Sequence, residues 1–298
     1  ECAIFRSEDG GKGLIPVLPG AKDDLSYDDN KVLSIEGTAL HMLPDGTWEF
    51  FVSSEKALQY PQPFGDFQKP GTGIWTIDRM TGVTIEELDP ATLTLVLGNH
   101  DRPEYLHLKD PVVYDDPDGN TVLLFASHPF TWASGNTGIA LRARGGKRFE
   151  IHDWEVVSRG PSWDVAVTRL TCRLPIPDIG CFAEEPPASI YFYDGAECMR
   201  AHQESPFALE RPRGYSCEEI GGAFFGWDVA PLSELKRLSS TQPLFVSPWG
   251  TGSSRYVDAV MTGAGVLAVW QQSQTDLSQP LVGNHLPKEE VDRILSAG

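Results

Sequence analysis

The sequence lacks the features that mark several large classes of protein. No apolar run approaches the ~20 residues that a membrane-spanning helix needs, so no membrane segment is expected. Lys and Arg total 24 against 42 Asp and Glu, which gives a formal net charge of −18, and the basic residues form no stripe. Because binding of a nucleic acid needs clustered positive charge, we expect no nucleic-acid partner.

Cysteine is scarce, and its spacing gives no metal motif. The five cysteines include no CxxC pair, which argues against a zinc site, and their odd number leaves at least one thiol unpaired. Disulfides between Cys172 and Cys181 or between Cys198 and Cys217 are open alternatives to free thiols. The acidic composition fits a secreted or periplasmic protein whose leader preceded Glu1. A cytoplasmic protein with free thiols is the alternative.

Segments with helical periodicity are nearly absent before residues 287–295, where Pro287 falls in the first turn of a predicted short helix. The content of 29 Gly, 23 Pro and 8 Trp suits a chain of many short strands and turns. No Gly/Ser linker, charge block or low-complexity run divides the 298 residues. We therefore predict a single domain over residues 1–298.

One strand, turn and strand pattern recurs along the chain. It is clearest at 107–129, HLKDPVVYDDPDGNTVLLFASHP, where two apolar runs flank a turn rich in Asp, Pro and Gly. It returns around Pro44-Asp45-Gly46 and in the segment that begins at Asp258. Further strand-like pieces follow, which gives modules at 34–97, 107–160, 163–247 and 254–286.

Units of this kind are typical of a propeller. The segment CAIF at 2–5 is expected to complete the last blade and close the ring. If residues 219–225 form an inner strand, the modules reach five directly. The predicted fold is all-β, a five-bladed β-propeller with a short C-terminal helix.

Acidic residues stand where the predicted first strands begin. In a propeller blade the first strand starts at the functional face, and the loop between the second and third strands returns to it. The four entrances carry Glu36, Asp110, Asp164 and Asp258, and most of the returning loops hold aromatic residues. Carboxylates surrounded by flat apolar rings are what a sugar site needs.

The segment KDPVVYDDPDGNTVLLFAS at 109–127 resembles the second blade of the five-bladed β-propeller glycosidases, the clan of glycoside hydrolase families 43, 32 and 62, and PVLPG at 16–20 is similar to its opening. The resemblance implies a base or nucleophile in the first blade, an Asp that tunes pKa values and a Glu proton donor. Asp110 matches the tuning Asp by motif. Glu36 falls in the register of the first-blade acid, with Asp24 as a rival, although the family has Asp-Pro where this chain has Glu36-Gly37.

The proton donor has three candidates. Glu185, in AEEPPASIYFYDG, loosely resembles the clan's Glu-Gly-Pro, whereas strand topology favours Glu219, and Glu197 is the third. Asp164 is a further catalytic candidate. Crowded, desolvated carboxylates oppose one another's ionisation, so one of them can stay protonated near neutral pH. We predict inversion, with Glu36 as base, Asp110 as tuner and Glu219 as acid.

The predicted substrate-binding residues combine polar and aromatic side chains. An Arg in this setting could bind a sugar hydroxyl or a uronate carboxylate, or could pair with an acid and join neighbouring blades. No cofactor is expected, with a structural calcium ion in the central channel as the alternative. The predicted substrate-binding residues are His128, Trp132, Trp163, Arg169, Arg255 and Asp258.

Three functions follow, in order of preference. The first is a glycoside hydrolase that uses carboxylate general acid/base catalysis on a poly- or oligosaccharide. The second is a polysaccharide lyase acting on a uronate-containing glycan, with Arg169, Arg255 or Lys109 neutralising the carboxylate. The third is a non-catalytic carbohydrate-binding propeller. A carbohydrate is the expected partner in each case, and the oligomeric state stays open.

Overall fold

In the computed structural model, each strand pairs with its neighbours in sequence. The structure describes residues 2–8, 15–20, 22–27, 30–62, 64–98, 102–129, 134–197 and 219–297. Within these ranges the strands form four sheets of three or four strands and one two-stranded ribbon. The chain divides into two compact units, Glu1–Ala133 with Thr137–Glu155, and Ser134–Asn136 with Val156–Gly298. We call them the first and second unit.

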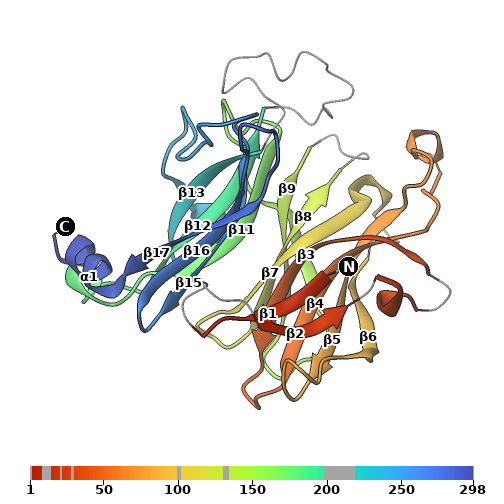
Figure 1. Cartoon of the computed structure of the whole chain (residues 1–298), viewed down its shortest axis with the longest axis horizontal. Coiled ribbons are helices and arrows are strands. Elements are labelled where there is room, and N and C mark those ends of the chain that lie inside the picture. The colour runs from red at the N-terminus through yellow and green to blue at the C-terminus, as the bar shows by residue number, and fades with distance from the viewer. Residues whose placement is uncertain are drawn as a thin grey trace. The chain divides into compact units, whose positions relative to one another are not determined.

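The first unit contains the ribbon and two sheets of four strands, each drawn as a run of successive arrows in Figure 1. The ribbon is β1 (Cys2–Arg6) and β2 (Ile15–Gly20). The first sheet is β3 (Val32–Met42), β4 (Trp48–Lys56), β5 (Ile74–Gly82) and β6 (Asp89–Leu97). The second is β7 (His107–Asp115), β8 (Thr121–His128), β9 (Asn136–Arg142) and β10 (Glu150–Val157), whose last residues cross into the second unit.

The second unit contains one sheet of four strands, one of three, and the helix. The first sheet is β11 (Val167–Pro175), β12 (Ala188–Ala196), β13 (Ile220–Trp227) and β14 (Lys236–Arg237). The second is β15 (Ser254–Thr262), β16 (Gly265–Gln272) and β17 (Leu281–Pro287), followed by α1 (Lys288–Ser296). The predicted C-terminal helix is therefore confirmed. Short 3-10 turns are η1 (Lys22–Leu25), η2 (Gly65–Phe67), η3 (Pro103–Tyr105), η4 (Gly180–Phe182) and η7 (Leu232–Glu234).

The four predicted modules correspond to these four sheets, but the fifth blade is wrong for the described part of the chain. Cys2 pairs with Gly20 in the ribbon, so β1 does not complete the last sheet. Residues 220–227 do not open a sheet of their own, because Gly195 pairs with Ile220 and makes β13 the third strand after β12. Each of these segments thus pairs antiparallel with its neighbour in sequence rather than with a distant sheet edge.

Apolar side chains pack on both faces of β4, as the alternation of a strand requires. Phe51 belongs to a cluster shared with the second sheet of the first unit, which includes Leu123 and Phe125. Phe50 and Val52 face the other way, onto a cluster with Leu25 of η1. In the second unit a smaller cluster of Cys172, Leu174 and Ala259 joins β11 to β15. Neighbouring sheets are thus held together within each unit by apolar contacts.

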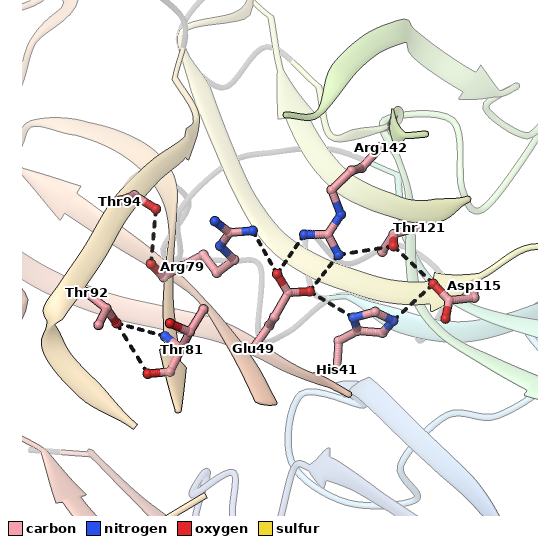
Figure 2. A network of polar contacts seen from close by, with 9 residues as sticks. All are labelled: His41, Glu49, Arg79, Thr81, Thr92, Thr94, Asp115, Thr121 and Arg142. Atoms are coloured by element: carbon pink, nitrogen blue, oxygen red, sulfur yellow. Dashed lines mark hydrogen bonds and ion pairs between the residues drawn. The ribbon is translucent and has the colours of Figure 1, made fainter. Parts of the chain in front are cut away.

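In the first unit, a buried charge network links the two four-stranded sheets at the ends of β3 and β7 (Figure 2). The Glu49 carboxylate accepts two hydrogen bonds of 2.6 Å from Arg142 and one of 2.7 Å from Arg79. His41 places its two ring nitrogens 3.0 Å from Glu49 and 3.1 Å from Asp115. The His41 side chain therefore bonds to other protein side chains through both of its ring nitrogens.

The prediction of a single domain over residues 1–298 stays a prediction.

Of the two alternatives left open for Cys172 and Cys181, the structure shows free thiols and no disulfide between them. Cys172 is buried in the middle of β11, where its sulfur lies 3.2 Å from the backbone of Ala259, whereas Cys181 is exposed in η4. Cys198 and Cys217 lie outside the described residues. Within the described ranges, no helix has the length and apolar character that spanning a membrane would take.

Candidate functional site

In the first unit, the first halves of β3 and β7 bring Glu36, Lys109 and Asp110 together. Lys109 Nζ contacts the Glu36 carboxylate and lies 3.8 Å from Asp110 Oδ2. The same nitrogen lies 4.8 Å from the centroid of the Trp75 ring. Lys109 and Asp110 have side chains only 7 % exposed, whereas that of Glu36 is 39 % exposed. Glu36 is therefore the member of this cluster that a ligand can reach most easily.

The backbone at Asp110 is held in an unusual conformation. Its φ of 55° lies in the left-handed region, which non-glycine residues seldom adopt. The ladder to β8 shifts register between Lys109 and Val112, and the Asp110 N–H donates to Ser53 Oγ over 2.8 Å. Strain of this kind persists only where the surroundings impose it, and it is concentrated at functional sites.

The backbone at Gly37 requires glycine at the position where the family that the sequence resembles has proline. Gly37 has a φ of 57°, and a Cβ at this position would lie 2.5 Å from Asp110 Oδ1 and 2.7 Å from Asp110 Cα. No side chain fits there, and proline cannot adopt a positive φ. The departure from the family motif is thus the consequence of a close approach between β3 and β7.

His107 supports this cluster in its neutral form. Burial, reinforced by the charge of Lys109, lowers the pKa of His107 to about 3. The backbone N–H of Trp75 donates to His107 Nδ1 over 3.4 Å, which leaves the hydrogen on Nε2, 3.0 Å from the Tyr60 hydroxyl. A neutral, fixed imidazole therefore packs beside Lys109 without adding positive charge.

In the second unit, the beginnings of β11 and β15 form a second cluster around Glu219. Arg169 Nη2 lies 2.7 Å from Asp194 Oδ2 and 2.8 Å from Glu219 Oε1. Arg255 Nη1 donates to Glu219 Oε2 over 2.9 Å. Both guanidinium groups lie over the Tyr256 ring, at 4.5 Å and 5.0 Å from its centroid. Two acids and two cations thus share one small volume.

Asp194 is the acid in this cluster whose protonation is altered most clearly. Burial raises the pKa of Asp194 to about 7, with a further contribution from the Glu219 charge and against the opposing effect of Arg169. Its carboxylate accepts the Tyr256 N–H at 3.1 Å and 3.2 Å. The Asp194 side chain is fully buried, whereas that of Glu219 is 15 % exposed. Burial therefore favours the protonated form of Asp194, while the Arg169 guanidinium and the Tyr256 N–H favour its carboxylate.

The two clusters share one backbone construction. Lys109 precedes the left-handed Asp110 at a register shift in β7, and Arg255 precedes the left-handed Tyr256, with a φ of 54°, at a register shift in β15. In each case the cation contacts a carboxylate on the neighbouring sheet or next to it. The same bulge therefore presents a cation in both units.

The acceptors of the left-handed N–H groups also correspond. Ser53, which receives the Asp110 N–H, pairs with Glu36 across β3 and β4. Asp194, which receives the Tyr256 N–H, pairs with Arg169 across β11 and β12. The two units thus place different chemistry on the same strand positions.

Several predicted residues lie elsewhere. Glu185 is exposed just before β12, at the end of the β11–β12 hairpin where Pro175 pairs with Ser189, whereas Arg169 and Asp194 pair near the other end. Of the two Glu candidates favoured by motif and by topology, only Glu219 joins the cluster. Glu197, whose pKa burial raises, follows β12, and Asp24 lies in η1.

Asp164 and Trp163 belong to a buried network of another kind. Asp164 Oδ2 accepts hydrogen bonds from the Tyr193 hydroxyl at 2.9 Å and from Arg237 Nε at 2.7 Å. Trp163 stacks on Tyr193 with ring centroids 5.4 Å apart. Both side chains are almost completely buried. This placement favours a structural role over the predicted catalytic and binding roles.

The remaining predicted binding residues are dispersed. Asp258 is exposed on β15 next to Cys172, and burial together with the Asp258 charge raises the pKa of that thiol to about 12. His128 is buried on β8, where it pairs with His107. Trp132 lies outside the described residues. Among the residues described, no group of three or more His, Cys, Asp or Glu side chains is arranged to hold a metal ion, and the expectation of no cofactor stays a prediction.

Lys109 and Asp194 are the functional candidates that sequence reasoning undervalued. The sequence suggests Lys109 only as a cation for a lyase, and it does not single out Asp194. The signal for Asp194 was its position opposite Arg169 once the β11–β12 hairpin is placed in register. That register depends on a 12-residue connection, 176–187, whose conformation no local turn motif fixes.

Comparison with known proteins shows the fold. No family model matches the sequence, and no curated protein matches it. Among solved structures, the chain is similar to Zg3597, a family 117 glycoside hydrolase from Zobellia galactanivorans, with a TM-score of 0.55 and 11 % identity over 90 % of this chain and 70 % of that one.

Two further solved structures give the same result. An α-L-arabinofuranosidase from Lactobacillus brevis has a TM-score of 0.54 and 11 % identity over 92 % of this chain and 78 % of that one. An endo-arabinase from Bacteroides thetaiotaomicron has a TM-score of 0.53 and 9 % identity over 88 % and 78 %. The chain therefore has the all-β propeller fold found in these glycoside hydrolases, with four blades among the described residues.

Proposed function

We propose that the protein is a glycoside hydrolase that cleaves a neutral poly- or oligosaccharide by carboxylate general acid/base catalysis. The observation that carries this proposal is that Lys109 brings the accessible Glu36 of β3 and the buried Asp110 of β7 close to one ammonium group. The resemblance of the sequence to propeller glycosidases implies the roles of first-blade acid for Glu36 and of pKa-tuning Asp for Asp110. The fold shared with solved glycoside hydrolases supports the same conclusion.

The proposed roles follow from exposure and charge. Glu36 is the base that activates a water molecule, because its carboxylate reaches solvent and contacts a cation. Asp110, whose side chain is buried, tunes the pKa values of the catalytic acids. The role of Glu219 as proton donor stays a prediction from the sequence; in the second unit its carboxylate contacts Arg169 and Arg255. Inversion is part of the proposal, since a base that activates water gives a single displacement.

A neutral substrate is favoured because the cations of both clusters are already paired with protein carboxylates. Lys109 contacts Glu36, Arg169 contacts Asp194 and Glu219, and Arg255 contacts Glu219. A lyase would need such a cation for the uronate carboxylate of its substrate, and taking one would break an existing ion pair. The lyase is therefore the weaker alternative, and a binding propeller without catalysis is the third.

The test is a panel of neutral and uronate-containing glycans assayed for new reducing ends and for ultraviolet absorbance of unsaturated products. We expect reducing ends without that absorbance, and a loss of about 100-fold or more in Glu36→Gln and Glu219→Gln. Glu185→Gln, at the other end of its hairpin, is the matched control and should retain wild-type turnover. The anomer released first, followed by NMR, tests inversion.

Other outcomes would select another function. Absorbing products would select the lyase, and glycan binding without turnover would select the binding propeller. Full turnover in Glu36→Gln would remove Glu36 from the mechanism.

A further inference from the structure

We propose that Lys109 is a positioning residue that keeps the Glu36 carboxylate ionised and fixed in orientation. This inference rests on the proposed function of Glu36 as the base. Lys109 touches Glu36 directly, and it lies close enough to Asp110 to interact with both carboxylates. Its contribution is therefore to the state of Glu36 rather than to the bonds that change in the reaction.

The position of the Lys109 ammonium group is fixed from several sides. The Lys109 side chain is 7 % exposed, and Lys109 immediately precedes Asp110, whose backbone is left-handed. The Lys109 ammonium group lies over the face of the Trp75 ring, whose partial negative charge attracts the cation. A cation removed from water in this way needs a counter-charge, because an unpaired buried charge costs several kcal/mol. Glu36 supplies that charge on the accessible side.

The charges around Glu36 explain why such a cation is needed. Glu36 and Asp110 are like charges on adjoining strands, and each opposes the ionisation of the other. His107 is neutral, Tyr60 and Ser53 carry no charge, and Trp75 contributes only its ring. Lys109 contacts Glu36 and lies 3.8 Å from Asp110 Oδ2. It allows both carboxylates to be charged at the same time, which a base working near neutral pH requires.

The second unit provides independent support for this assignment. Arg255 holds the position that corresponds to Lys109, before the left-handed residue in a bulged first strand, and it too contacts a carboxylate. A cation delivered to a carboxylate is therefore a repeated feature of this backbone. At Lys109 the carboxylate it meets is the more exposed one, 39 % against 15 % for Glu219.

The first experiment needs no substrate. Carbon-13 NMR of glutamate carboxyl groups is recorded against pH, with the Glu36 signal assigned by its loss in Glu36→Gln. In the wild type we expect Glu36 to take up its proton below the ordinary glutamate value of about 4.3. In Lys109→Met the midpoint should rise by about one pH unit or more, as expected when an opposite charge in contact is removed. Lys109→Arg should restore the wild-type midpoint.

Lys147→Met is the matched control, an exposed lysine in the turn between β9 and β10 of the same unit, and it should leave the Glu36 midpoint unchanged. An unchanged midpoint in folded Lys109→Met would overturn the proposal. If neither Lys109→Met nor Lys109→Gln folds, the wild type decides alone, because a Glu36 midpoint at or above about 4.3 is incompatible with it.

Where a substrate is found, the acidic limb of the kcat/KM profile should move upward by the same amount in Lys109→Met. A merely structural role would lower activity at all pH values without moving that limb. Failure to find any glycosidase activity would leave the NMR result standing, so the two proposals fail separately.

Discussion

Two residues with left-handed backbones meet where β3 passes β7. Gly37 has no alternative, since its Cβ would lie within 2.7 Å of Asp110, whereas Asp110 adopts a φ of 55° although it has a side chain. Such a conformation costs about 1–3 kcal/mol in a non-glycine residue. The hydrogen bond from the Asp110 N–H to Ser53 offsets part of that cost. The backbone therefore tolerates strain in order to place Lys109 and Asp110 beside Glu36.

Asp194 makes the stability of the protein depend on pH in an unusual direction. Burial raises the pKa of Asp194 to about 7 from an ordinary 3.8, so between these values the folded protein binds a proton that the unfolded chain has released. The unfolding free energy contributed by Asp194 must then fall as pH rises from about 4 to about 7. The slope is at most about 1.4 kcal/mol per pH unit for one proton.

The measurement is urea denaturation from pH 4 to pH 8 for the wild type and for Asp194→Asn. The variant lacks the titrating group, so its stability relative to the wild type should increase steadily across this range. Asp258→Asn changes an exposed acid of the same unit and should follow the wild type. Wild-type and Asp194→Asn curves that stay parallel would show that Asp194 is ionised in the folded state throughout.

At the scale of elements, the network around Glu49 joins six strands of two sheets, β3, β4, β5, β7, β8 and β9 (Figure 2). Burial by itself would raise the pKa of Glu49, but the hydrogen bonds and charges of Arg142, His41 and Arg79 outweigh burial and lower it to about 2. The side chain is 1 % exposed and that of Arg142 is 5 % exposed. The contacts on Glu49 therefore stabilise the packing of one sheet on the other.

Removing one partner from this network should be costly. Glu49→Gln leaves Arg142 and Arg79 without their shared counter-charge, and loss of one partner of a buried pair costs about 3–5 kcal/mol. Because the pKa of Glu49 is lowered, its contribution is present above the ordinary value of 4.5 and is lost as pH falls towards 2.

Urea denaturation at pH 7 and pH 3 checks both expectations for Glu49→Gln. The difference between wild type and variant should be large at pH 7 and smaller at pH 3. Glu150→Gln, on an exposed position of β10, is the control. A difference below about 1 kcal/mol at pH 7, the range of an exposed ion pair, would show that the network adds little to stability.

The sequence predicted what is decided locally. The turns at Asp45-Gly46 and Asp118-Gly119 follow from residues whose preferences act over four positions, and both glycines have the expected positive φ. The sequence placed Glu36 and Asp110 at strand entrances, whereas the structure places them inside β3 and β7. The contacts of Lys109 with Glu36 and of Arg169 with Asp194 were not predictable, because they depend on register shifts and on the packing of separate strands.

At the scale of the whole molecule, both units are built in the same way from two neighbouring sheets whose first strands meet. The predicted fifth blade failed at this scale, because the partner of an N-terminal strand is a non-local choice that the residues of β1 do not reveal. Cys2 to Arg6 could pair with any free edge, and the chain used β2. Composition, in contrast, is a property of the whole chain that needs no contact to be known.

The net charge of −18 gives a prediction at this same scale. With 42 acidic and 24 basic residues, the summed interaction among surface charges is repulsive and favours expanded states. The Debye length shortens from about 30 Å at 0.01 M salt to about 8 Å at 0.15 M, so added salt should weaken this repulsion. The buried pairs of Glu49 and Asp194 are screened far less, because salt does not enter their surroundings.

We therefore expect the midpoint of thermal unfolding to rise by a few degrees as NaCl is increased over this range at pH 7.5. A neutral osmolyte at equal osmolality, which leaves the Debye length unchanged, separates screening from general solvent effects. Glu49→Gln should show a similar increment from a lower starting temperature, since the network it breaks is buried. A midpoint that falls with salt would mean that attractive surface pairs outweigh the excess of acids, and that the arrangement of the charges, not their sum, sets the response.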